Sequence, residues 1–242
     1  MIGVRHLSNA PVKEALIAFQ FSAEWMRELS SVCVELAGAD GRLSDLLETD
    51  LQIKLDSAAS PQLEPLSSSR IGKRIDFDEL KQVLQVQRDS FTFSQLEPYS
   101  NWENMLAQAY SSWKTISSAL TGVEISRMTV RYINAIDLPI PDLNFEDYLN
   151  ASPSVPEGLP QGLSQFLIKT VSPVEDDIVI VTQSLTEVVD NKARVVLDID
   201  TSCLKKTELT EESFIKTLSR LRDRKNKVFF SYLTEKTLEM YK

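Results

Sequence analysis

Alternation between apolar and polar residues is clearest in residues 125–139. A strand points successive side chains to opposite faces of its sheet. This segment is therefore predicted to be a long central strand with one packed face and one polar face. One face is predicted to carry Arg127, Thr129, Arg131, Ile133 and Asp137, and the other Met128, Val130, Tyr132, Asn134 and Ile136.

Shorter segments complete the predicted secondary structure. Strands are expected at 14–21, 51–55, 82–87, 91–96, 165–171, 178–185 and 194–199. Apolar residues at steps of three and four predict helices over 24–36, 100–122 and 210–241. Ser100 and Thr210 are the predicted N-caps of the last two, and Thr234 is expected to start a separate final helix. Residues 57–69, rich in Ser, Ala and Pro, are expected to form a surface loop.

The order of these elements predicts an α+β fold. Strands joined by hairpins favour a largely antiparallel twisted sheet, with helices packed on one of its faces. The chain of 242 residues fits a single domain over 1–242. Each half also runs as a strand, a crossing, a meander and a closing helix, so 7–122 and 123–242 are candidate halves of a pseudo-repeat.

Composition and charge narrow the class of protein. Hydrophobic residues make up 43% and charged residues 25%, which is ordinary for a soluble globular protein. The net charge of −9 argues against a general nucleic-acid binder. Cys33 and Cys203 are too few for a disulfide framework, so we expect a protein of the reducing cytoplasm. No apolar run is long enough for a membrane span, so we expect no membrane partner.

Few residues offer familiar catalytic chemistry. His6 is the sole histidine, which removes Ser–His and Cys–His catalysis and the usual imidazole metal sites. The sequence contains neither a phosphate-binding loop nor a dinucleotide fingerprint. We therefore expect no cofactor and favour a non-enzymatic role. Asp198 and Asp200, about 7 Å apart on one face of a strand, are weak candidates for Mg²⁺ with Asp137; the alternative is that they pair with Arg or Lys.

The central strand holds the best candidate site. Arg127 and Arg131 would lie about 13 Å apart, so they would bracket an extended ligand such as a peptide C-terminus, a nucleotide or the carboxylates of a partner protein. The alternative is an internal ion pair with Glu14 or Asp137. The candidate partner-binding or ligand-binding set is Arg127, Arg131, Tyr132, Asn134 and Asp137.

A second candidate site is a basic run near the C-terminus. It contains Arg220, Arg222, Arg224, Lys225 and Lys227, with Asp223 as the one acid. In an acidic chain, such a run could contact nucleic acid or an acidic partner. The alternative is the solvated face of a helix.

Five segments, taken in order, carry a family resemblance. They are Leu7–Ala15, Pro98–Glu103, Arg131–Asn134, Leu197–Asp200 and Asn226–Lys236. Together they resemble a sporadically distributed, uncharacterised family of bacterial and archaeal proteins of about this length. The resemblance implies a small prokaryotic cytoplasmic protein without a transferable catalytic residue. Patchy distribution is typical of mobile or anti-phage defence genes, including toxin–antitoxin pairs.

Three functional hypotheses follow. The first is a non-enzymatic interaction protein, antitoxin-like or an accessory subunit of a defence system, that binds another protein through the Arg131 strand face and the tail helix; a homodimer is a further assembly to test. The alternative is a sensor or enzyme for a small anionic ligand, with a cavity between the sheet and the C-terminal helix. Nucleic-acid binding through the basic run ranks third.

Overall fold

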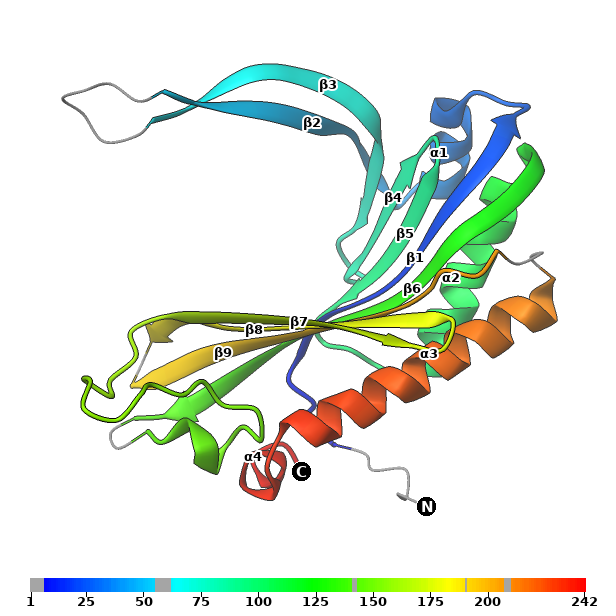
Figure 1. Ribbon diagram of the computed structural model, residues 1–242. Coiled ribbons are helices and arrows are strands. Elements are labelled where there is room, and N and C mark those ends of the chain that lie inside the picture. Colours follow the sequence, from blue (N-terminus) through cyan, green and yellow to red (C-terminus); the bar gives the residue numbers. More distant parts are fainter. Residues whose placement is uncertain (1–6, 55–61, 141–142, 190, 207–209) are drawn as a thin grey trace.

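The computed structural model describes residues 7–54, 62–140, 143–189, 191–206 and 210–242 (Figure 1). The described residues form one nine-stranded sheet in which every neighbouring pair is antiparallel. The strands are β1 (Val12–Trp25), β2 (Arg42–Lys54), β3 (Gln62–Phe77), β4 (Gln82–Gln87), β5 (Ser90–Leu96), β6 (Leu120–Pro139), β7 (Phe166–Val174), β8 (Asp177–Val189) and β9 (Lys192–Cys203). Their order is β2-β3-β4-β5-β1-β6-β9-β8-β7.

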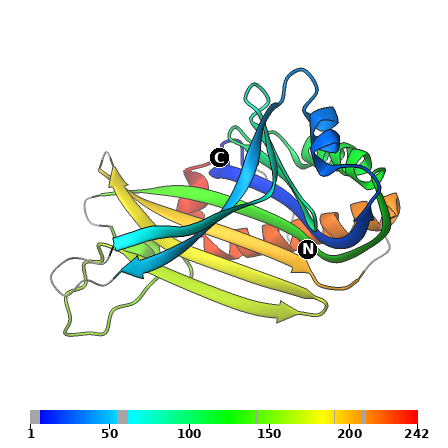
Figure 2. The ribbon, with the colours of Figure 1, turned by 90° about the horizontal axis from the view of Figure 1, so that it is seen from above.

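Helices complete the α+β fold that the sequence predicts. They are α1 (Leu29–Ala37), α2 (Trp102–Ser117), the 3-10 turn η1 (Phe145–Asp147), α3 (Glu211–Tyr232) and α4 (Glu235–Glu239). Phe19 of β1 packs against Trp113 of α2 and Phe214 of α3, with ring centroids 5.3 and 5.4 Å apart. The two long helices therefore share a face of the sheet, and Figure 2 shows them together beneath it. None of the described helices has the length and apolar character needed to cross a membrane.

Helix caps follow the sequence closely in the C-terminal region. Thr210 caps α3 in a reciprocal capping box with Ser213, and Thr234 caps α4, so both predictions are confirmed. The predicted cap of α2 is one residue off, because the Asn101 side chain, rather than that of Ser100, accepts a hydrogen bond from the Asn104 amide at 2.8 Å. In addition, β1 continues through Trp25, so the predicted helix at 24–36 begins only at Leu29.

The second and third strands extend beyond the rest of the sheet. β3 pairs with β4 only from Gly72 to Phe77, while its remaining residues pair with β2 alone. This two-stranded arm projects from the body on the side away from α3 (Figure 1). The predicted loop at 57–69 is corrected here: residues 62–69 belong to β3, and 57–61 lie outside the described residues.

Two apolar clusters make up the core. The larger lies under α1, α2 and the first half of α3, and the smaller lies between β6, β8, β9 and the C-terminal end of α3. Cys33 and Cys203 are buried free thiols, as expected for Cys33 from its place in an apolar pattern. Helix α3 thus crosses from one cluster to the other, and one of its faces packs against β6 between them.

Candidate functional site

Strand β6 divides the predicted site residues between the two faces of the sheet. Tyr132 and Asn134 are 2% and 1% exposed on the face that the helices cover. Arg127, Arg131 and Asp137 are half-buried on the opposite, open face. The alternation predicted from the sequence is present, but it means that these five side chains cannot surround one ligand.

On the open face, both arginines of β6 pair with carboxylates of the neighbouring strand β9. Arg131 donates two hydrogen bonds to Asp198, from Nε at 2.8 Å and from Nη2 at 2.6 Å. Arg127 Nη2 lies 3.5 Å from Asp200 Oδ2 and donates to Ser202 Oγ at 2.8 Å. The internal ion pairs therefore exist, although their partners are not Glu14 or Asp137 as the sequence suggested.

The remaining carboxylate candidates are also paired. Asp137 accepts hydrogen bonds from Arg194 at 2.7 and 3.1 Å, and these bonds hold the pKa of its carboxyl below the usual range. Asp198 and Asp200 face guanidinium groups. In the described part of the chain, no three His, Cys, Asp or Glu side chains are grouped so that they could hold a metal ion.

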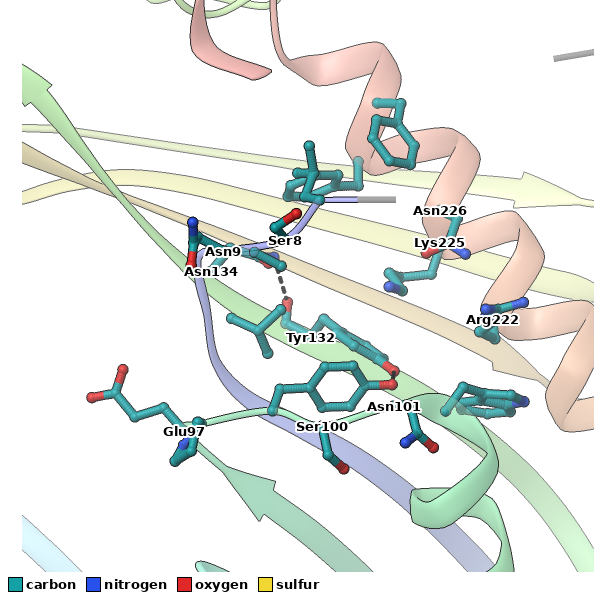
Figure 3. Close-up of a pocket in the computed structure, with 18 of the residues that line it drawn as sticks. Ser8, Asn9, Glu97, Ser100, Asn101, Tyr132, Asn134, Arg222, Lys225 and Asn226 are labelled. Atoms are coloured by element: carbon teal, nitrogen blue, oxygen red, sulfur yellow. Dashed lines mark hydrogen bonds between the residues drawn. The ribbon is translucent and has the colours of Figure 1, made fainter. Parts of the chain in front are cut away.

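The basic run on α3 does not form one surface. Arg220 and Arg224 pair with the buried carboxylate of Asp177 at the start of β8. Lys227 is exposed, whereas Arg222 and Lys225 lie on the side of the helix that faces β6 (Figure 3). Because successive residues of a helix point in different directions, the five cations form three groups. Arg220 and Arg224 bind Asp177, Lys227 faces solvent, and Arg222 and Lys225 face β6.

A pocket of about 690 Å³ lies between α3, strand β6 and the start of α2 (Figure 3). Its walls come from four separated parts of the chain: residues 7–12, the connection at 97–103, β6 and α3. The polar side chains around it are Ser8, Asn9, Glu97, Tyr99, Ser100, Asn101, Glu103, Tyr132, Asn134, Arg222, Lys225 and Asn226. This volume is typical of small-molecule sites.

Lys225 is the most unusual side chain in the pocket. It is only 8% exposed, and its Nζ lies 3.4 Å from the centre of the Tyr132 ring. Among the described residues, no carboxylate forms an ion pair with this amine. Burial, with a smaller effect from the nearby Arg222, lowers the pKa of Lys225 to about 7. The face of the Tyr132 ring acts in the opposite sense, since it attracts a cation.

Two tyrosines lie beside this lysine. The hydroxyls of Tyr99 and Tyr132 are 2.8 Å apart and share a hydrogen bond. Burial raises the pKa of both phenols, so both stay protonated at neutral pH. One hydroxyl donates within the pair, which leaves the proton of the other available for a ligand.

Hydrogen bonds to backbone carbonyl groups fix two further parts of the pocket wall. Asn134 Nδ2 donates to the carbonyl of Leu197 at 2.9 Å, which fixes the amide in place. The β1–β6 register shifts between Val12 and Glu14, opposite Asn134, and such bulges often redirect side chains next to functional sites. The backbone amide of Asn9 donates a hydrogen bond to the backbone carbonyl of Tyr241 at 3.1 Å, which joins the N-terminal segment to the C-terminal one.

The pocket charges are arranged unequally. Arg222 and Lys225 lie on one side, where the Arg222 guanidinium carbon is 6.0 Å from the centre of the Trp102 ring. Glu97 lies away from these two cations (Figure 3), is exposed and forms an ion pair with Lys13. Glu103, in the first turn of α2, is also exposed. The buried end of the pocket is therefore positive.

Lys225 was predicted as part of a basic run, whereas the structure buries it in the wall of the pocket. The signal was the apolar stripe of α3, because Leu218, Leu221, Lys225 and Phe229 follow one another at steps of three and four. A lysine at a stripe position is expected to be buried. Tyr99 belongs to a segment that reaches the pocket only through tertiary packing, and nothing local in the sequence indicates this.

Comparison of the chain with protein-family models, with curated proteins and with solved structures finds no match. The chemistry of the pocket is therefore the ground for a functional assignment.

Proposed function

We propose that the protein binds a small anionic ligand in the pocket between β6 and α3. The observation that carries this proposal is the pair of inward-facing cations, Arg222 and Lys225, one helical turn apart on α3. Lys225 is nearly buried and has no carboxylate partner among the described residues. A buried charge without a counter-ion is costly. An anion bound between Arg222 and Lys225 would reduce their mutual repulsion and would offset the cost of burying the charged lysine.

The neighbouring groups suit a carboxylate or a similar anion. The planar guanidinium of Arg222 can bind two oxygens at once, and the Lys225 amine can add a third contact. The hydroxyl pair of Tyr99 and Tyr132 offers a neutral donor. The N-terminus of α2 borders the pocket, where its dipole adds a weak positive potential.

Thermal unfolding with small anions tests this proposal. Malonate, pyruvate and phosphate are added separately to the wild-type chain and to Arg222→Met, Lys225→Met and Lys227→Met variants. We expect at least one anion to raise the Tm of the wild type and of Lys227→Met, whose changed residue is exposed on the same helix. Arg222→Met and Lys225→Met should lose this increase. An equal increase in all four proteins would contradict binding in the pocket.

A second candidate function is the binding of another protein, in the antitoxin-like or accessory role that the family resemblance implies. The observation that favours it is the arm of β2 and β3, which extends beyond the other strands (Figure 1). A two-stranded ribbon is marginally stable alone, so a partner protein would stabilise it. A shortened arm, with 47–70 replaced by a tight turn, should leave the body folded and lose a co-purifying partner. Retention of that partner would exclude the arm as the surface that binds it.

We also propose that 7–122 and 123–242 are pseudo-repeats within a single domain. In each half, the first strand pairs with the last strand of the following meander, β1 with β5 and β6 with β9. The two first strands then pair with each other at the centre of the sheet. In each half a long helix, α2 or α3, follows the meander.

A further inference from the structure

We propose that Lys225 is a nucleophile that forms an imine with the carbonyl carbon of a small 2-oxo acid. This inference rests on the proposed binding of an anion in the pocket and adds the class of ligand and the chemistry. It starts from the position of the amine, which is nine-tenths buried, faces the pocket and lies against the Tyr132 ring.

A lysine amine must be neutral to attack a carbonyl group. Lys225 has a pKa lowered to about 7 by burial and by Arg222, so a large share of its amine is unprotonated at neutral pH. Lys227, two residues further on α3, is exposed. The pocket therefore selects one amine of this helix for nucleophilic chemistry.

The class of ligand follows from the second cation. Residues three apart on a helix are neighbours, with Cβ atoms about 5–6 Å apart, so Arg222 and Lys225 can reach adjacent groups of one small molecule. If Arg222 binds a carboxylate, the Lys225 amine can reach the carbon atom attached to it. In a 2-oxo acid that atom is an electrophilic carbonyl carbon, which explains why a nucleophile and an anion-binding group would lie side by side.

The proposed step balances without an oxidant or a reductant. The Lys225 nitrogen lone pair forms a bond to the carbonyl carbon, while the C=O π pair moves to the oxygen. The Tyr99–Tyr132 hydroxyl pair donates a hydrogen bond to this oxygen, which takes up a proton as the nitrogen loses one to water. The resulting hydroxyl is protonated again and leaves as water, and the nitrogen lone pair closes the C=N bond.

Reductive trapping of the full chain tests the inference. The protein is incubated with pyruvate and sodium cyanoborohydride near neutral pH, and the product is analysed by intact mass and by peptide mapping. We expect one carboxyethyl group per chain, attached to Lys225, because its pKa is lowered and its amine faces the pocket. The exposed Lys227, which does not line the pocket, should be labelled far more slowly. Labelling spread evenly over the lysines would overturn the proposal.

Two controls separate the imine from simple anion binding. Lactate matches pyruvate in size and charge but lacks the carbonyl group. Lys225→Arg keeps a cation, so its Tm should still rise with pyruvate while the trapped product disappears; if this variant does not fold, the peptide map of the wild type decides. A rise in Tm with lactate and pyruvate without trapped product would overturn the imine and leave anion binding intact. No rise with either and no product would overturn both.

Discussion

Lys225 combines burial, the absence of a described carboxylate partner and contact with an aromatic face. Lysine is almost never fully buried without a partner. The burial of Lys225 is therefore expected to affect the stability of the fold as well as ligand binding. The other titratable groups around this pocket are Arg222, Glu97, Glu103, Tyr99 and Tyr132. Both tyrosines stay neutral over the neutral range, because burial raises their pKa values. Lys225 is the pocket group whose lowered pKa falls near neutrality.

Stability should depend on pH through Lys225. In the unfolded chain this amine keeps its proton up to its ordinary pKa of 10.5, whereas in the folded chain the pKa is lowered to about 7. Between these values the unfolded state binds more protons, so the free energy of unfolding rises with pH, by about 1 kcal/mol per pH unit. Below about pH 7 both states are charged, and the full cost of burial remains.

Denaturant unfolding of the wild type and of Lys225→Met at about pH 6, 7, 8 and 9 measures this contribution. The free-energy difference between wild type and variant should shift in favour of the wild type as pH rises. A difference that stays constant over this range would show that the folded amine keeps its ordinary pKa.

The open face offers a second residue-scale prediction. Arg131 donates both of its hydrogen bonds to Asp198, whose side chain is 18% exposed. Arg131→Met should lower the free energy of unfolding by about 1–3 kcal/mol, because it leaves this carboxylate without its partner. Arg27→Met, which removes an exposed ion pair with Glu35, should cost at most about 1 kcal/mol.

A variant with both Arg131→Met and Asp198→Asn completes this comparison. It should recover part of the loss, since the half-buried carboxylate is also removed. If Arg131→Met unfolds as the wild type does but abolishes partner binding, the pair is a binding site rather than a structural contact.

At the scale of elements, the pattern of β6 and the caps of α3 and α4 could be predicted from the sequence because they are local. The partners of Arg127 and Arg131 could not, since they depend on which strand lies next to β6 and in which register. Strand β3 was not predicted, because its first part is a Ser-rich stretch that is typical of loops and is held in a strand by pairing with β2. Tertiary contacts overrode local composition there.

The bend where the arm leaves the sheet gives an element-scale prediction. At Gly72, an added Cβ would lie 2.3 Å from the carbonyl oxygen of Val86, which is backbone and cannot move aside. Gly72→Ala should therefore lower the free energy of unfolding by about 1–3 kcal/mol. Gly162→Ala is the matched control, because its Cβ would meet nothing within 4 Å and its change should stay within about 0.5 kcal/mol. Equal effects of the two changes would contradict the described pairing of β3 with β4.

At the scale of the whole molecule, the pocket depends on parts of the chain that meet only after folding. The N-terminal segment, the connection before α2, the central strand β6 and helix α3 each supply one wall. A ligand that contacts all four would stabilise the entire fold, by about 3 kcal/mol at a hundredfold excess over its Kd. No single segment of the sequence could indicate such a site, although Tyr132 and Asn134 were singled out on β6 for their polarity.

Native mass spectrometry of the protein purified gently from its own host tests the central claim most directly. We predict a small anionic molecule bound at one per chain, released on denaturation and absent from a variant that carries Arg222→Met and Lys225→Met. The Lys227→Met variant should retain it. Absence of a bound small molecule from the wild type would contradict a ligand site between β6 and α3. A molecule that the double variant retains as well as the wild type does would also contradict it.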